Sequence, residues 1–278
     1  MEKIRKITDY QNPKAESEIR FGRTEKWWNK HFARYEKGQR FSSKMKLTIQ
    51  QNDVKQLVET YNLKGLEFGN WMTQADREDA YLCLRWSLHN LEDVFGKNIG
   101  FDTHIGIAVG ARGLGGKALA HYEPLDNMIN LTKTKGAGCL AHEYGHALDY
   151  NFGTYLEQSK FYCSLSGGID IQKIRPLGDT KNLRYYVNYI VNFVNEKNGS
   201  LLNNMTVYWR QRNEIFARTF EQLLAHKIGY VDEYLYKSTA EYERLSQFGI
   251  YLKYIDVREI MPKFNIMVRM MKQELEKK

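Results

Sequence analysis

The sequence predicts an α+β fold with a small mixed sheet and a mainly helical C-terminal half. Two observations predict this class. Segments with apolar residues at helical spacing lie on both sides of residues 105–133, and within that stretch short apolar and β-branched runs alternate with glycine. A hydrophobic content of 42% in 278 residues is enough to bury a sizeable core. The chain is therefore expected to be globular.

Two helices are predicted before the sheet. The segment NDVKQLVETYNLKG begins at a capping residue, Asn52 or Asp53, and stops at Gly65. The next helix begins at Thr73, a favourable N-cap, and runs to Gly96. Its apolar residues recur on one face, which consists of Ala80, Leu84, Leu88 and Leu91. This face predicts a helix that packs into the core.

A strand and further helices are predicted after the glycine-rich stretch. The run MINLTK, residues 128–133, has the apolar and β-branched character of a strand. In RNEIFARTFEQLLAHKIG, residues 212–229, apolar positions recur at helical spacing up to the terminating Gly229. The tail, residues 231–278, is predicted to be helical, with a break at Pro262.

The positive charge is concentrated at the N-terminus. Residues 1–50 hold thirteen Lys or Arg against six Asp or Glu, which is +7 of the net charge of +8. We therefore divide the chain into a basic aromatic arm (1–50), a core (51–230) and a helical extension (231–278). Several aromatic residues of the arm recur at helical spacing and are expected to dock on the core. The alternative is that the cations and rings of the arm contact nucleic acid.

The sequence also predicts the compartment. No stretch approaches the roughly 18–20 apolar residues of a membrane span, and the N-terminus has no apolar core of the kind that secretion signals carry. The three cysteines, Cys83, Cys139 and Cys163, include no CxxC pair, so neither a disulfide framework nor a thiolate zinc site is expected. These features favour a cytoplasmic protein without membrane contact.

The motif that indicates chemistry is HEYGH, residues 142–146. On a helix, residues four apart point nearly the same way, so the imidazoles of His142 and His146 can converge on one ion. Glu143 then faces a water molecule on that ion and can take its proton. An ordinary helix with two solvent-facing histidines is disfavoured, because the surrounding residues are apolar and small and uncompensated buried histidines are costly. The motif predicts a metal site.

Two histidines are not enough for a catalytic zinc ion, which normally takes three protein ligands and one water. Glu214 is the preferred third ligand, because an acid in the first turn of a helix can project into a cleft. Glu221 on the same helix is the weaker choice, and His104, His121 and His226 are alternatives. Asp149 lies too far past His146 to bind the ion, but it can accept the second imidazole N–H and orient a histidine.

The strand MINLTK directly precedes the HEYGH segment and is expected to bind the substrate. An extended peptide can add to the edge of a sheet through main-chain hydrogen bonds. We expect Asn130 and Leu131 to supply these main-chain bonds. Such bonds determine the direction in which the peptide binds more than which residues it contains.

The segments HEYGHALD and NEIFARTFE resemble the zincin metallopeptidases of the gluzincin kind, in which a glutamate on a second helix completes the metal site. More narrowly, GLEFGNW, AVGARGLGG, AHYEP, INLTKTKGAGCLAHEYGHALD and EIFARTFE are similar, in that order, to the first of the large polyvalent protein-associated domains, zincin-like domains of phages and conjugative elements. The likeness covers about residues 65–225. It implies a zincin-like core with His142, His146 and Glu214 as zinc ligands, Glu143 as the catalytic acid, and Tyr208 near the substrate carbonyl.

Together, these features predict a peptidase that uses Zn²⁺ and a metal-activated water to hydrolyse peptide bonds in a protein or peptide, with Glu143 as general base and acid. The alternative is a non-catalytic or weakly catalytic zincin-fold accessory module of a phage or mobile element, which binds DNA or a protein partner through its basic arm. Glu143 argues against that alternative, because a purely structural metal site has no need of it. If such an element encodes the chain, the cytoplasm is that of a host cell.

Overall fold

The computed structural model of the chain describes residues 51–112, 118–133, 135–156, 162–165 and 182–277. The basic aromatic arm, residues 1–50, lies outside the described residues. Its docking on the core and its contact with nucleic acid therefore stay predictions.

The two predicted helices that precede most of the sheet both form, as α3 (Gln51–Thr60) and α4 (Gln74–Phe95). The predicted stop of the first helix at Gly65 is wrong, because α3 ends at Thr60 and Asn62 is already left-handed, with φ = 49°. At the start of α4 the Thr73 hydroxyl accepts a hydrogen bond from the Asp76 N–H, and the Asp76 carboxylate accepts one from the Thr73 N–H, which satisfies two of the free donors of the first turn. Gly96 ends the helix with φ = 81°, a conformation that glycine adopts at little cost.

The sheet has four strands in the order β1-β2-β4-β3. Strands β1 (Leu66–Phe68), β2 (Gly106–Val109) and β4 (Met128–Leu131) are parallel to one another, and β3 (Ala120–Glu123) is antiparallel to β4. The structure thus confirms a mixed α+β protein that is mostly helical and has a small mixed sheet.

Strand β4 lies inside the sheet, so the prediction that it offers an edge to a substrate is wrong. Asn130 lies between Ala108 of β2 and His121 of β3, and Leu131 lies between their neighbours Val109 and Ala120. Both residues are buried. The local pattern identifies the strand, but the order of strands depends on pairing between segments that are distant in the sequence. The strand at the end of the described sheet beside β4 is β3.

The second half of the described chain is helical. Its elements are α5 (Leu140–Asn151) with a π-helical continuation η2 (Phe152–Leu156), then α7 (Leu183–Leu202), α8 (Val207–Arg210), α9 (Arg212–Ile228), α10 (Thr239–Ser246) and α11 (Tyr254–Glu276). As predicted, α9 ends at Gly229, which is left-handed. The predicted break at Pro262 is wrong, because α11 continues through this proline. Burial of the apolar face of α11 offsets the roughly 3 kcal/mol that an internal proline costs.

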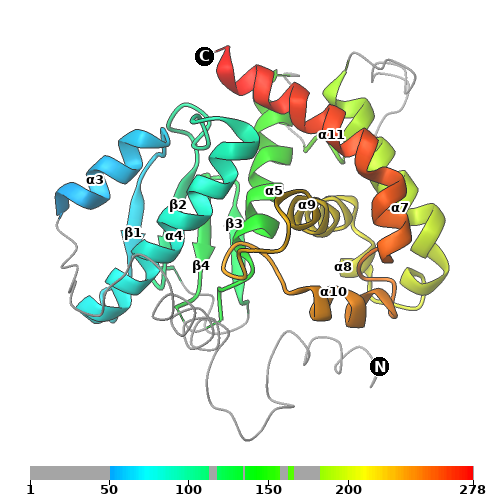
Figure 1. Cartoon of the computed structure of the whole chain (residues 1–278), viewed down its shortest axis with the longest axis horizontal. Helices are drawn as coiled ribbons and strands as arrows, with labels where there is room; N and C mark the ends of the chain where they lie inside the picture. The colour runs from blue at the N-terminus through cyan, green and yellow to red at the C-terminus, as the bar shows by residue number, and fades with distance from the viewer. Residues whose placement is uncertain (1–50, 113–117, 134, 157–161, 166–181, 278) are drawn as a thin grey trace, which may run out of the picture.

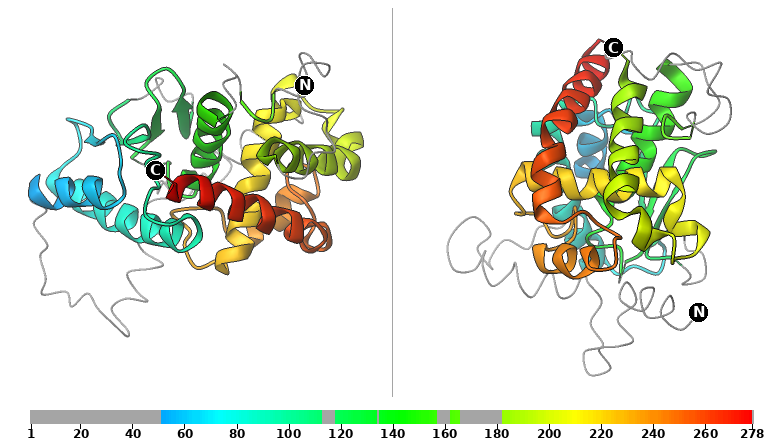
Figure 2. Two further views of the ribbon diagram at one scale, coloured as in Figure 1. Left: turned by 90° about the horizontal axis from the view of Figure 1, so that it is seen from above. Right: turned by 90° about the vertical axis from the view of Figure 1, so that its right-hand side faces the viewer.

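The sheet lies with α3 and α4 on one side of the molecule, the helices α7 to α11 lie on the other, and α5 stands between them (Figure 1). Helix α11 packs along α7 and reaches α4, so the C-terminal helix joins the two sides (Figure 2). Buried residues of both sides form one hydrophobic cluster. Among the described residues, no helix combines the length and apolar character that crossing a membrane requires.

Helices α5 and α9 approach each other closely at Gly145, the fourth residue of HEYGH. A Cβ placed on Gly145 would lie 3.0 Å from Phe220 Cδ1 and 3.3 Å from Ala217 Cα. A larger residue here would require the Phe220 ring or the backbone of α9 to shift by a few tenths of an ångström. The close packing matters for the site, because it brings the first turn of α9 to the two histidines of α5.

We predict that Gly145→Ala lowers the free energy of unfolding by about 1–2 kcal/mol, because overpacking costs about 1–3 kcal/mol and improved helix propensity returns up to about 1 kcal/mol. The matched control is Gly199→Ala in α7, where a Cβ would meet nothing within 4 Å. This control is expected to raise stability by about 0.5–1 kcal/mol. Urea unfolding of both variants tests the prediction, and equal effects would contradict it.

Candidate metal centre

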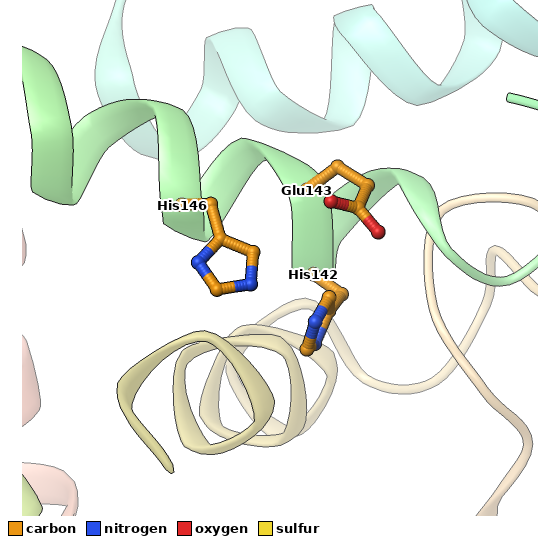
Figure 3. A group of neighbouring side chains, drawn as sticks. All are labelled: His142, Glu143 and His146. Atoms are coloured by element: carbon orange, nitrogen blue, oxygen red, sulfur yellow. The ribbon is translucent and has the colours of Figure 1, made fainter. Parts of the chain in front are cut away.

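The HEYGH segment forms the first turns of α5, as the sequence predicts. The apolar residues of this helix are buried in the core, while the rings of His142 and His146 point towards α9 (Figure 3). Glu143 projects from a different side of the helix and is also buried, with 6% of its surface exposed. The ligand atoms of His142, Glu143 and His146 lie within 4.8 Å of one another, so these three residues could hold a metal ion.

Glu214, in the first turn of α9, faces both histidines. Its Oε1 lies 3.3 Å from His146 Nε2, and its Oε2 lies 3.6 Å from His142 Nε2. The three side chains are 8–14% exposed, so the cluster is largely shielded from solvent. Two helices 68 residues apart in the sequence, from His146 to Glu214, therefore bring two imidazoles and a carboxylate to one point.

The spacing of these atoms fits a metal ion. Zinc binds nitrogen and oxygen at about 2.0–2.2 Å, and at tetrahedral angles two such ligand atoms lie about 3.3–3.6 Å apart. The distances from Glu214 Oε1 to His146 and from Glu214 Oε2 to His142 fall in this range, so each carboxylate oxygen is placed to share an ion with one imidazole. Glu214 Oε2 is also buried without a hydrogen-bond partner, an arrangement that is costly in a finished protein core. A cation between the side chains would satisfy it.

The electrostatics of the cluster show strong mutual attraction. Burial would raise the pKa of Glu214, but the adjacent imidazoles outweigh burial and bring this pKa well below its usual range. For His146, burial would lower the pKa, but Glu214 and Glu143 raise it. Burial raises the pKa of Glu143, and the two histidines partly oppose that rise. The raised pKa of His146 favours a proton on this ring beside the carboxylate, and a bound cation would take over that role.

A buried arginine supports the position of Glu214. Arg218, one turn later on α9, places its Nη1 3.7 Å from Glu214 Oε2. Its Nη2 donates a hydrogen bond of 2.6 Å to the main-chain oxygen of Trp209 in α8, and its guanidinium lies over the Trp209 ring. Arg218 thus links α8 to the first turn of α9. No sequence pattern pointed to this residue.

Two tyrosines flank the cluster. Tyr208 in α8 was expected near the substrate, and the structure places its hydroxyl beside Glu214: burial of the hydroxyl and the charge of Glu214 raise its pKa. Its side chain is nevertheless 48% exposed, so part of the ring faces solvent. Tyr162 was not foreseen. Its ring packs 6.5 Å from that of His146, and burial together with Asp149 raises its pKa.

The alternative histidine ligands do not join the cluster as Glu214 does. His226 lies at the far end of α9, twelve residues or about 18 Å from Glu214, and packs against Tyr230 and Tyr254. His104 Nδ1 contacts the Phe101 carbonyl oxygen at 2.6 Å. Of the three, His121 on β3 is the one that acts on the site electrostatically, because a charge on its ring would lower the pKa of Glu143.

The two remaining carboxylates lie behind the histidines. The Asp149 carboxylate accepts hydrogen bonds from the Ser164 N–H and hydroxyl, and burial raises its pKa to about 6. It acts on His146 electrostatically, and its orientation of a histidine stays a prediction. Glu221, weighed as a ligand from the sequence, instead has its Oε2 3.8 Å from His142 Nδ1, on the opposite side of the ring from Glu214.

A known protein family matches the C-terminal part of this chain, from α8 to α11. Residues 203–275 match the model of the large polyvalent protein-associated domain 1 family, which confirms the resemblance to that domain. Of the region from which the resemblance is drawn, residues 65–225, the match includes 203–225, and the likeness to zincin peptidases stays a prediction. The match includes Glu214 and Glu221 but not the HEYGH helix. No curated protein and no solved structure gave a significant match.

Proposed function

We propose that this chain is a zinc-dependent peptidase in which His142, His146 and Glu214 bind the ion. The observation that carries the proposal is the convergence of these three side chains, at spacings that suit a tetrahedral ion, beside a fourth residue, Glu143, that is not needed as a ligand. The family match supports an association with a phage or mobile element.

Glu214 is a better third ligand than Glu143. The Glu214 oxygens approach the two imidazoles to 3.3 and 3.6 Å, from the helix towards which both rings point. In addition, Glu143 follows His142 directly and leaves α5 on a different side from the two rings (Figure 3). In this assignment Glu143 is not a ligand and would be available as a base.

The reaction then follows from the positions of the side chains. A bound zinc ion supplies Lewis acidity, which lowers the pKa of a water molecule to about 7 and polarises a carbonyl group. Glu143 takes the proton of the attacking water and delivers it to the leaving amine. The Tyr208 hydroxyl, beside Glu214, is a donor for the carbonyl oxygen as negative charge develops on it.

The substrate is proposed to bind as an extended peptide along β3. This strand ends the described sheet next to β4, and a peptide that adds to it would gain main-chain hydrogen bonds. His121 on β3 is close enough to influence Glu143, so a peptide on this strand would pass near the proposed base. Strand pairing recognises backbone, which suits unfolded polypeptides more than a particular sequence.

Removal of the metal tests the proposal. We expect the purified protein to bind one zinc ion per chain, to cleave a denatured protein, to lose this activity after dialysis against 1,10-phenanthroline, and to regain it when zinc is added. The readouts are zinc content by mass spectrometry and fragments on gels. A protein that binds no zinc, or that cleaves equally well after the ion is removed, would exclude the proposed function.

A further inference from the structure

A buried carboxylate behind His142 has an unusually complete set of donors. Glu221 is fully buried on α9, and its Oε1 and Oε2 lie 2.8 and 2.9 Å from Lys237 Nζ. The hydroxyls of Tyr242 and Tyr251 donate to the same carboxylate at 3.0 and 2.9 Å. We call Glu221, Lys237, Tyr242 and Tyr251 the Glu221 network. All three donors come from the segment that follows α9.

The network is poorly explained by stability alone. Lys237 is only 4% exposed, and a buried ion pair costs desolvation that a well-packed apolar pair of the same volume would avoid. Cores therefore seldom gain from such a pair. The buried charges suggest a role that an apolar pair could not fill.

Beyond its three donors, the Glu221 carboxylate faces the proposed metal site. Its Oε2 lies 3.8 Å from His142 Nδ1, while the other ring nitrogen, Nε2, lies 3.6 Å from Glu214 Oε2. Glu214 and Glu221 are seven residues apart, so they project from the same face of α9 and hold the His142 ring between them. At 3.8 Å the contact with Glu221 is electrostatic and longer than a hydrogen bond.

We infer that Glu221 is a positioning residue that fixes the tautomer and ring orientation of His142. This inference rests on the proposed function. A neutral imidazole that binds an ion through Nε2 must carry its proton on Nδ1, and the Glu221 carboxylate is the negative group that faces this nitrogen, at 3.8 Å. The network holds this carboxylate in place. Residues 237–251 then belong to the metal site, although the sequence assigns them to a separate helical extension.

The inference is tested with three variants whose zinc affinity is measured by competition with a fluorescent chelator. Glu221→Gln removes the charge that faces His142 and is expected to weaken zinc binding about 10–100-fold. Glu221→Gln combined with Lys237→Met also removes the stranded lysine charge. This double variant is expected to regain thermal stability but not zinc affinity. A structural role predicts that affinity recovers together with stability.

The matched control is Asp232→Asn. Asp232 is likewise fully buried and accepts hydrogen bonds from Ser87 and Asn90, but no described contact joins it to a histidine. It should lose stability and keep the zinc affinity of the unsubstituted protein. In the cobalt-substituted protein, only the Glu221 variants should shift the visible absorption bands.

The outcomes separate this inference from the proposed function. Unchanged zinc affinity in a folded Glu221→Gln variant, or full recovery of affinity in the double variant, would overturn the role of Glu221 and leave the zinc peptidase intact. An unsubstituted protein that binds no zinc would overturn both.

Discussion

Glu143→Gln is expected to keep the zinc content of the unsubstituted protein and to lower kcat/KM for a denatured protein or unstructured peptide by about 10²–10⁴-fold. Glutamine has nearly the same shape as glutamate but cannot accept the proton of the attacking water. The expected loss is large because proton transfer occurs both in the attack of water and in the departure of the amine.

The control for this variant is Glu59→Gln on α3, an exposed position whose ion pair with Lys55 is 3.7 Å long. It should leave both zinc content and cleavage unchanged. Zinc by mass spectrometry and cleavage rates with one peptide substrate provide the comparison. If Glu143→Gln retains full activity, Glu143 is not the base. If the unsubstituted protein cleaves nothing while it binds zinc, a binding module becomes the better account.

Glu214→Gln is expected to lower zinc affinity by more than about 100-fold, since loss of a ligand should exceed the 10–100-fold cost of losing a residue that only orients one. Activity should fall in parallel at limiting zinc. Glutamine is chosen over alanine because it preserves the volume and a polar oxygen beside the buried Arg218.

The pair of glutamate variants identifies the third ligand. If Glu214 binds the ion, Glu214→Gln loses zinc and Glu143→Gln keeps it. If Glu143 binds the ion instead, as the grouping of His142, Glu143 and His146 also permits, the two results are exchanged. Chelator competition on both proteins, with unfolding temperatures measured alongside, separates the two arrangements.

The parts of the fold that depend on neighbouring residues could be predicted from the sequence. The capping box at Thr73 and the left-handed Gly229 are local features, and both mark the helix ends correctly. The tolerance of Pro262 could not be predicted, because it depends on packing of α11 against distant helices. The prediction of an edge strand is wrong for the same reason: the apolar and β-branched character of MINLTK shows that it is a strand but not which strands flank it.

The features of the site can likewise be divided into those that local sequence predicts and those that depend on distant residues. The i, i+4 spacing of His142 and His146 shows that they share a helix face, and the first-turn position of Glu214 suggests that it can reach a cleft. The close approach at Gly145, which brings these two helices together, has no local signature. The donors to Glu221 also lie beyond local pattern, because they follow it by 16 to 30 residues and meet it only in the folded chain.

The central claim is that His142, His146 and Glu214 hold one ion in common. Anomalous diffraction at the zinc edge from crystals of the zinc-loaded protein tests it most directly. We predict one strong peak, about 2.0–2.2 Å from the Nε2 atoms of both histidines and from a carboxylate oxygen of Glu214, with Glu143 outside bonding distance. A peak bonded to Glu143 and not to Glu214, or no peak between α5 and α9, would contradict the account.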